Sequence, residues 1–124
     1  MILKMDIEYA EWKVLSNISE DILKQFKYIL IEFHFKSDPI FYYYQILKKL
    51  LNTHEIFYIH CNACGGTKNY GKNIICEALE VSYIIKDNYQ FTKDDTIYPI
   101  PELETKNCGK LSNLNLNLFK LFDY

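Results

Sequence analysis

The sequence predicts an α/β fold built on a mostly parallel sheet. Short apolar segments alternate with segments whose apolar residues recur at helical spacing, the pattern of parallel strands joined by helices. Residues 28–35, YILIEFHF, form a near-continuous apolar run, as expected for a strand buried on both faces. No helix separates the last two apolar segments, at 55–61 and 74–86, so we expect these to pair antiparallel.

The remaining elements follow in chain order. The opening MILKMDIE is short and apolar and then polar, which predicts a strand, and YAEWKVL after it can start a helix. Ser19 is placed to cap a second helix, and acids follow it in the first turn. Asp38 as cap and Pro39 at the first helical position predict a third helix. Its expected buried stripe is Ile40, Tyr44, Leu47 and Leu51.

Helices are expected to pack on the faces of this sheet, with Trp12 as a core anchor under the first one. The segment NACGGTKNYGKN, at 62–73, is predicted to be a loop, and the chain turns irregular from about residue 88. Residues 111–122 alternate with period two, as an edge strand would. We see no linker, so residues 1–124 are interpreted as one partial domain.

Composition excludes some classes of function. The formal charge is −2, and all 14 basic residues are Lys, so the sequence gives no electrostatic reason to expect nucleic acid. No apolar run approaches the roughly 18 residues that a membrane span needs. The sequence also carries no address that would indicate a localisation.

Polar residues mark the end of each of the three predicted parallel strands. The pairs are Asp6 with Glu8, Glu32 with His34, and His60 with Asn62. Two residues separated by one position on a strand point to the same face, and ligands of open α/β sheets bind at the carboxyl ends of the strands. One such acid is usually a helix cap or a solvated turn residue. Three pairs at corresponding positions predict a ligand site along one edge of the sheet.

The same segments resemble a known family. ILKMDIEYAEWKVL is similar to the LKIDIEGAEWEVL stretch of FkbM-type S-adenosylmethionine-dependent methyltransferases, in particular the animal methyltransferase-like branch. The likeness continues through IEFHF, FYIHCNACGG, ALEVSYIIK and YPIPELETKNCG. It implies the C-terminal half of a Rossmann-like class I methyltransferase domain, with three parallel strands and an antiparallel last strand.

The resemblance also implies roles for individual residues. Asp6 and Glu8 would lie beside the methyl donor and, with His34, act in catalysis. The residues implied on the substrate side are Glu11, Glu32, His60 and Asn62. The reaction implied is O-methyl transfer from S-adenosylmethionine to a small-molecule or sugar-like acceptor.

Two departures from the family pattern change these expectations. The family Gly after DIE is Tyr9 here, which predicts strain if that position needs a left-handed backbone. The sequence also lacks the Gly-rich turn and following acid that would hold the adenosine half of the donor, so we expect the isolated chain to be inactive. An open sheet edge at residues 2–8 would favour self-association.

Two alternatives stay open. The chain could be a catalytically inactive remnant that serves as a binding or interaction module. CNACGG carries a C-x-x-C pair, so Cys61, Cys64, Cys76 and Cys108 could instead form a zinc site. A second C-x-x-C pair is absent, however, and four cysteines are few for a disulfide scaffold, so reduced thiols are expected.

Overall fold

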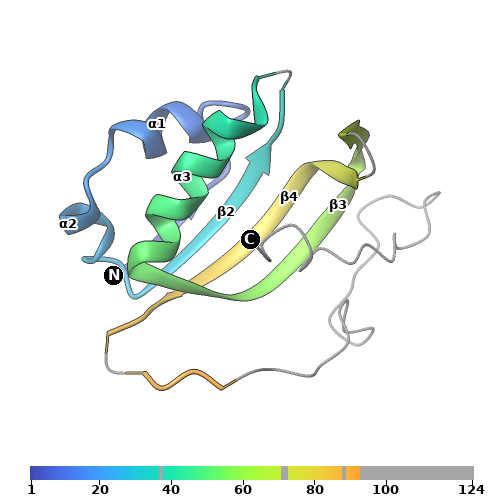
Figure 1. Ribbon diagram of the computed structural model, residues 1–124. Helices are drawn as coiled ribbons and strands as arrows, with labels where there is room; N and C mark the ends of the chain where they lie inside the picture. Colours follow the sequence, from blue (N-terminus) through green and yellow to red (C-terminus); the bar gives the residue numbers. More distant parts are fainter. Residues whose placement is uncertain (37, 71–72, 88, 93–124) are drawn as a thin grey trace.

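A four-stranded mixed sheet with three helices makes up the described part of the chain (Figure 1). The computed structural model describes residues 1–36, 38–70, 73–87 and 89–92. The strands are β1 (Ile2–Met5), β2 (Tyr28–His34), β3 (His54–Tyr70) and β4 (Asn73–Ile85). The helices are α1 (Glu11–Asn17), α2 (Glu20–Leu23) and α3 (Ile40–Thr53). The predicted alternation of strands and helices is therefore confirmed, whereas the edge strand predicted at 111–122 lies outside the described residues.

The strand order is β1-β2-β4-β3, which places the antiparallel strand inside the sheet. β1 and β2 pair in parallel, and β4 pairs antiparallel with both β2 and β3. β1, β2 and β3 thus run in one direction, as predicted, but β4 lies between β2 and β3. β4 lies beside β2 because β3 and β4 form a hairpin, and the second strand of this hairpin is apolar enough to be buried inside the sheet.

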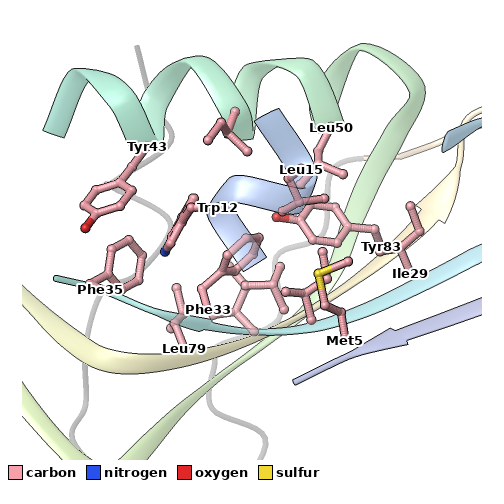
Figure 2. Packing of buried hydrophobic residues seen from close by; sticks show 14 of the residues in the cluster. Met5, Trp12, Leu15, Ile29, Phe33, Phe35, Tyr43, Leu50, Leu79 and Tyr83 are labelled. Atoms are coloured by element: carbon pink, nitrogen blue, oxygen red, sulfur yellow. The ribbon is translucent and has the colours of Figure 1, made fainter. Parts of the chain in front are cut away.

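The hydrophobic core lies between one face of the sheet and the helices (Figure 2). In β2 the residues at 29, 31 and 33 are buried, and their partners in β4 at 83, 81 and 79 are buried as well. Trp12 on α1 is 3% exposed and stacks on Phe33 with 4.6 Å between ring centroids. All the helices in the described ranges pack on this one face, rather than on both faces as the sequence suggested.

The helix starts follow local capping, with one correction. The Ser19 hydroxyl accepts a hydrogen bond from the Ile22 backbone N–H at 3.3 Å, which confirms the predicted cap. For α3, Pro39 is the cap and the helix begins at Ile40, one residue later than predicted. Asp38 instead accepts from the Tyr43 hydroxyl at 3.0 Å.

The buried stripe of α3 is also offset by about one residue from the prediction. Its buried members are Tyr43, Ile46, Leu50 and Thr53. Ile40 and Tyr44, predicted to be buried, are 53% and 44% exposed. The reason is that Tyr43 packs against Trp12, with 4.4 Å between ring centroids, and this contact sets the rotation of the helix.

The predicted loop at 62–73 is mostly strand, because β3 continues to Tyr70. The pairing of β3 with β4 shifts register between Asn62 and Thr67, where the strand bulges. Two glycines permit this bulge. A Cβ on Gly65 would lie 2.8 Å from the Ala78 Cβ, and Gly66 has a φ of +85°.

A disulfide joins Cys61 on β3 to Cys76 on β4, across this bulge. Their Cα atoms are 5.8 Å apart, and the Cys76 residue is fully buried. No cysteine in the described part of the chain is a free thiol. The expectation of reduced thiols is therefore wrong. The alternative zinc site loses three of its four ligands, because Cys61, Cys64 and Cys76 are all disulfide-bonded.

The helices described here, of which α3 is the longest, are all too short or too polar to span a bilayer.

Candidate functional site

The predicted polar residues gather where β1 and β2 end. Asp6 and Glu8 follow β1, and Glu32 and His34 close β2, the next strand in the sheet. One carboxylate oxygen of Asp6, one of Glu8 and one ring nitrogen of His34 lie within 4.8 Å of one another. The polar side chains at the ends of these two parallel strands therefore lie close together, as expected.

His34 is the centre of this group. The residue is only 9% exposed, and its Nδ1 lies 3.1 Å from Glu11 Oε1. Its Nε2 faces two more carboxylates, at 3.8 Å from Glu8 Oε2 and 3.9 Å from Glu32 Oε1. Both distances are too long for a hydrogen bond. The ring is thus held at one nitrogen and presents the other to a space bordered by acids.

Glu11 supports the site from beneath, which revises the expected substrate contact. Its side chain is fully buried, so it offers no surface to a substrate. Oε1 accepts from the Ile7 backbone N–H at 2.9 Å and also faces His34. Oε2 is buried without a hydrogen-bond partner among the described residues. A carboxylate placed in this way fixes both the loop after β1 and the tautomer of the His34 ring.

Trp12 fixes His34 from the backbone side. Its indole Nε1 donates to the His34 carbonyl oxygen at 2.7 Å. The predicted role of Trp12 as a core anchor is confirmed, and the hydrogen bond adds a second role that the sequence did not indicate. α1 therefore supplies two adjacent residues, Glu11 and Trp12, that hold the end of β2.

Asn62 connects the third strand to this site. Its side-chain Nδ2 donates to Glu32 Oε1 at 2.8 Å, and its Oδ1 accepts from the Cys64 backbone N–H at 3.1 Å. Ala78 on β4 pairs with His34 of β2 on one side and with Asn62 of β3 on the other. β3 thus reaches the site across β4, and the small Ala78 side chain leaves room for this contact.

His60 lies on the same strand face, two residues before Asn62. The register places it opposite Glu80, which in turn is opposite Glu32. It is partly buried. His60 belongs to the same edge of the sheet, but the contacts around His34 come from Glu8, Glu11 and Glu32.

Tyr9 adopts the strained backbone that the sequence suggested. Its φ is +76°, and Glu8 before it has a φ of +51°. Left-handed backbone is unusual for residues other than Gly and Asn, and least suited to bulky side chains. The Tyr9 ring lies 5.2 Å from the His34 ring, centroid to centroid, and the Lys36 ammonium lies 4.5 Å from the Tyr9 centroid. The sequence predicted backbone strain at Tyr9 but not this aromatic contact with His34.

Comparison with known proteins finds a family match over the segment that carries the site. Residues 1–55 match the family described as Methyltransferase FkbM domain, which confirms the resemblance to FkbM-type methyltransferases over the stretch that carries Asp6, Glu8, Glu32 and His34. The chain is also 38% identical over 60 residues to the probable methyltransferase-like protein 24 of Rattus norvegicus. That match covers 40% of this chain and 16% of the rat protein. No solved structure matches the chain.

Proposed function

We propose that this chain forms the acceptor side of an S-adenosylmethionine-dependent methyltransferase that acts on hydroxyl groups. The observation that carries the proposal is the orientation of His34. Its Nδ1 is held by the buried Glu11 carboxylate, and its Nε2 opens toward Glu8 and Glu32. The family match over residues 1–55 supplies the class of reaction. The overall chain then corresponds to the C-terminal half of a Rossmann-like class I methyltransferase domain.

The residues that would hold the methyl donor fit only part of it. Its methionine end carries an ammonium and a sulfonium, and the exposed carboxylates of Asp6 and Glu8 suit those positive charges. The sequence offers no Gly-rich turn for the adenosine end. When bound, the donor supplies an electrophilic methyl group. We therefore propose that the adenosine half of the site is built by other parts of a larger domain.

The chain's own residues would handle the acceptor. With Glu11 accepting the Nδ1 proton, the Nε2 lone pair of His34 would take the proton of an acceptor hydroxyl. Glu32 is fixed by Asn62 and can orient that hydroxyl. Small-molecule or sugar-like acceptors carry hydroxyl groups. His60 and Asn62 lie along the edge of the sheet over which such an acceptor would extend.

Titration calorimetry and a methyl-transfer assay together test the proposal. We expect no saturable binding of S-adenosylmethionine to the purified 124-residue chain. Addition of the part of the rat relative that precedes the matched segment should restore transfer to hydroxyl acceptors. In that active form, His34→Gln should lower kcat roughly 100-fold, because general-base catalysis contributes on that order. Saturable donor binding to the chain alone, or an unchanged kcat in His34→Gln, would contradict the proposal.

One observation favours a second candidate, an inactive binding module. The Tyr9 ring lies against His34 at the position where the family carries Gly, and it narrows access to that ring. In this case the complemented protein would bind acceptors without methylating them. Tyr9→Gly would then gain methyl transfer that the unsubstituted protein lacks.

A further inference from the structure

We propose that Asp6, Glu8 and His34 form a binding site for a divalent first-row metal ion such as Mn²⁺. One oxygen of each carboxylate and one ring nitrogen lie within 4.8 Å of one another. An ion about 2.1 Å from each ligand separates neighbouring ligand atoms by about 3 Å and opposite ones by about 4.2 Å. Glu8 Oε2 and His34 Nε2, which lie 3.8 Å apart, would have to approach by about 0.8 Å to become neighbouring ligands, and the exposed Asp6 and Glu8 side chains can make such a movement by rotation.

The burial of His34 and the direction of its Nε2 are a second observation that points to a ligand. The residue is nine-tenths buried, and its Nε2 is aimed into the cluster without a hydrogen-bond partner among the described residues. The nearest carboxylate oxygens, on Glu8 and Glu32, are at 3.8 and 3.9 Å. These distances exceed a hydrogen bond and lie between the spacings of neighbouring and of opposite ligands around one ion.

The support behind His34 has the form found behind metal-binding histidines. Such a histidine commonly donates its other ring N–H to a carboxylate, which fixes the ring and strengthens the ligand nitrogen. Glu11 is that carboxylate, 3.1 Å from Nδ1 and fully buried. Glu32, held by Asn62, is placed to contribute a fourth ligand.

The charge and the ligand types select the kind of ion. Four carboxylates surround one imidazole, and the whole sequence contains no Arg to neutralise them. Carboxylates suit Mg²⁺, Ca²⁺ and Mn²⁺, whereas imidazole suits the first-row transition ions. Mn²⁺ satisfies both preferences. With the ion bound, the Nε2 lone pair of His34 is a ligand, so the ion in place of His34 would bind the acceptor oxygen and ease loss of its proton. That role rests on the proposed methyl transfer, whereas ion binding does not.

Binding of Mn²⁺ to the purified chain, followed by the loss of the free-ion electron paramagnetic resonance signal, tests the site. We expect one saturable site per chain. Asp6→Asn and Glu8→Gln should each weaken binding at least tenfold, since each removes a charged ligand from an exposed position. The matched control is Asp21→Asn, an exposed carboxylate on α2, which precedes the opposite end of β2. It should bind Mn²⁺ as the unsubstituted chain does.

His34→Gln should abolish binding, and its thermal unfolding is measured in parallel because the residue is buried. The two exposed variants carry the test if this variant does not fold. Absence of saturable binding, or equal affinity in Asp6→Asn, Glu8→Gln and Asp21→Asn, would overturn the site. Mn²⁺ binding without methyl transfer in the complemented protein would leave the site standing and remove the proposed function. Methyl transfer that is insensitive to metal removal would support the proposed function and overturn the proposed role of the ion in it.

Discussion

Tyr9 combines an unfavourable backbone with a contact to His34. Its φ of +76° suits Gly, and its ring lies against the imidazole at a tilt of 56°. Tyr9→Gly and Tyr9→Ala both remove the ring, but only Gly removes the strain. We expect the Gly variant to be more stable than the Ala variant by about 1 kcal/mol, because a side chain in the left-handed region costs that order of free energy. Urea unfolding of the two variants measures the difference, and equal midpoints would refute it.

Tyr83 offers a test of an unsatisfied buried hydroxyl. The residue is fully buried in the core, and its hydroxyl has no hydrogen-bond partner among the described residues. Burial also raises the pKa of the Tyr83 hydroxyl far above its usual value, so it stays neutral. Tyr83→Phe should raise the free energy of unfolding by about 1 kcal/mol, because the desolvation cost disappears with the oxygen.

Tyr43→Phe is the matched control for that measurement. The Tyr43 hydroxyl accepts from the Lys36 backbone N–H at 2.9 Å and donates to Asp38 at 3.0 Å. Its removal should lower the free energy of unfolding by about 1 kcal/mol. Chemical denaturation of both variants measures whether the free energy of unfolding rises or falls in each. A destabilised Tyr83→Phe would show that its hydroxyl is hydrogen-bonded in solution.

At the scale of the elements, β1 ends the described sheet on one side. It pairs only with β2 in that sheet, and Ile2 on it is 65% exposed. An apolar edge strand is a template for pairing with another chain. We expect the chain to self-associate with rising concentration, and Ile2→Lys to reduce this, because a charge at the edge disfavours pairing.

Sedimentation velocity over a range of concentrations measures the effect. Ile22→Lys is the control, since Ile22 is 45% exposed but lies on α2, away from the edge. It should associate like the unsubstituted chain. Equal behaviour of the two lysine variants would assign any association to another surface.

The elements also show what sequence patterns could and could not predict. The pairs at the ends of β1 and β2, Asp6 with Glu8 and Glu32 with His34, were located correctly because an apolar run that stops at polar residues is a local property of the sequence. His60 and Asn62 lie inside β3, which continues to Tyr70, so the prediction that this pair ends a strand was wrong. The insertion of β4 between β2 and β3 depends on which strands meet in space, which periodicity does not encode. The burial of Glu11 was missed for the same reason, since an acid at a helix start usually faces solvent.

For the whole molecule, His54 predicts how stability depends on pH. Its side chain is buried where β3 begins, and its Nε2 lies 2.9 Å from the Phe26 carbonyl oxygen. Burial lowers the pKa of His54 from its usual value of 6.5. The unfolded chain therefore binds the proton more readily than the folded chain does. The contribution of His54 to stability is complete above pH 6.5 and is lost as the pH falls toward the lowered pKa.

Urea midpoints at pH 7.5 and pH 5.5 test this dependence. The unsubstituted chain should lose more stability between the two pH values than His54→Gln does. His34 and His60 are present in both proteins, so their contributions cancel in the comparison. The same pH dependence in both proteins would contradict the assignment to His54.

The bond between Cys61 and Cys76 has a consequence for where the chain is made. Glutathione and thioredoxin keep cytosolic thiols reduced, whereas structural disulfides persist in the endoplasmic reticulum lumen and outside the cell. With Cys76 fully buried, the bond must form before or while the core closes around it. The fold therefore predicts biosynthesis through the secretory pathway. Maleimide labelling after rapid acid quenching of expressing cells should find both cysteines protected, and a Cys76→Ala chain should expose Cys61 to the reagent.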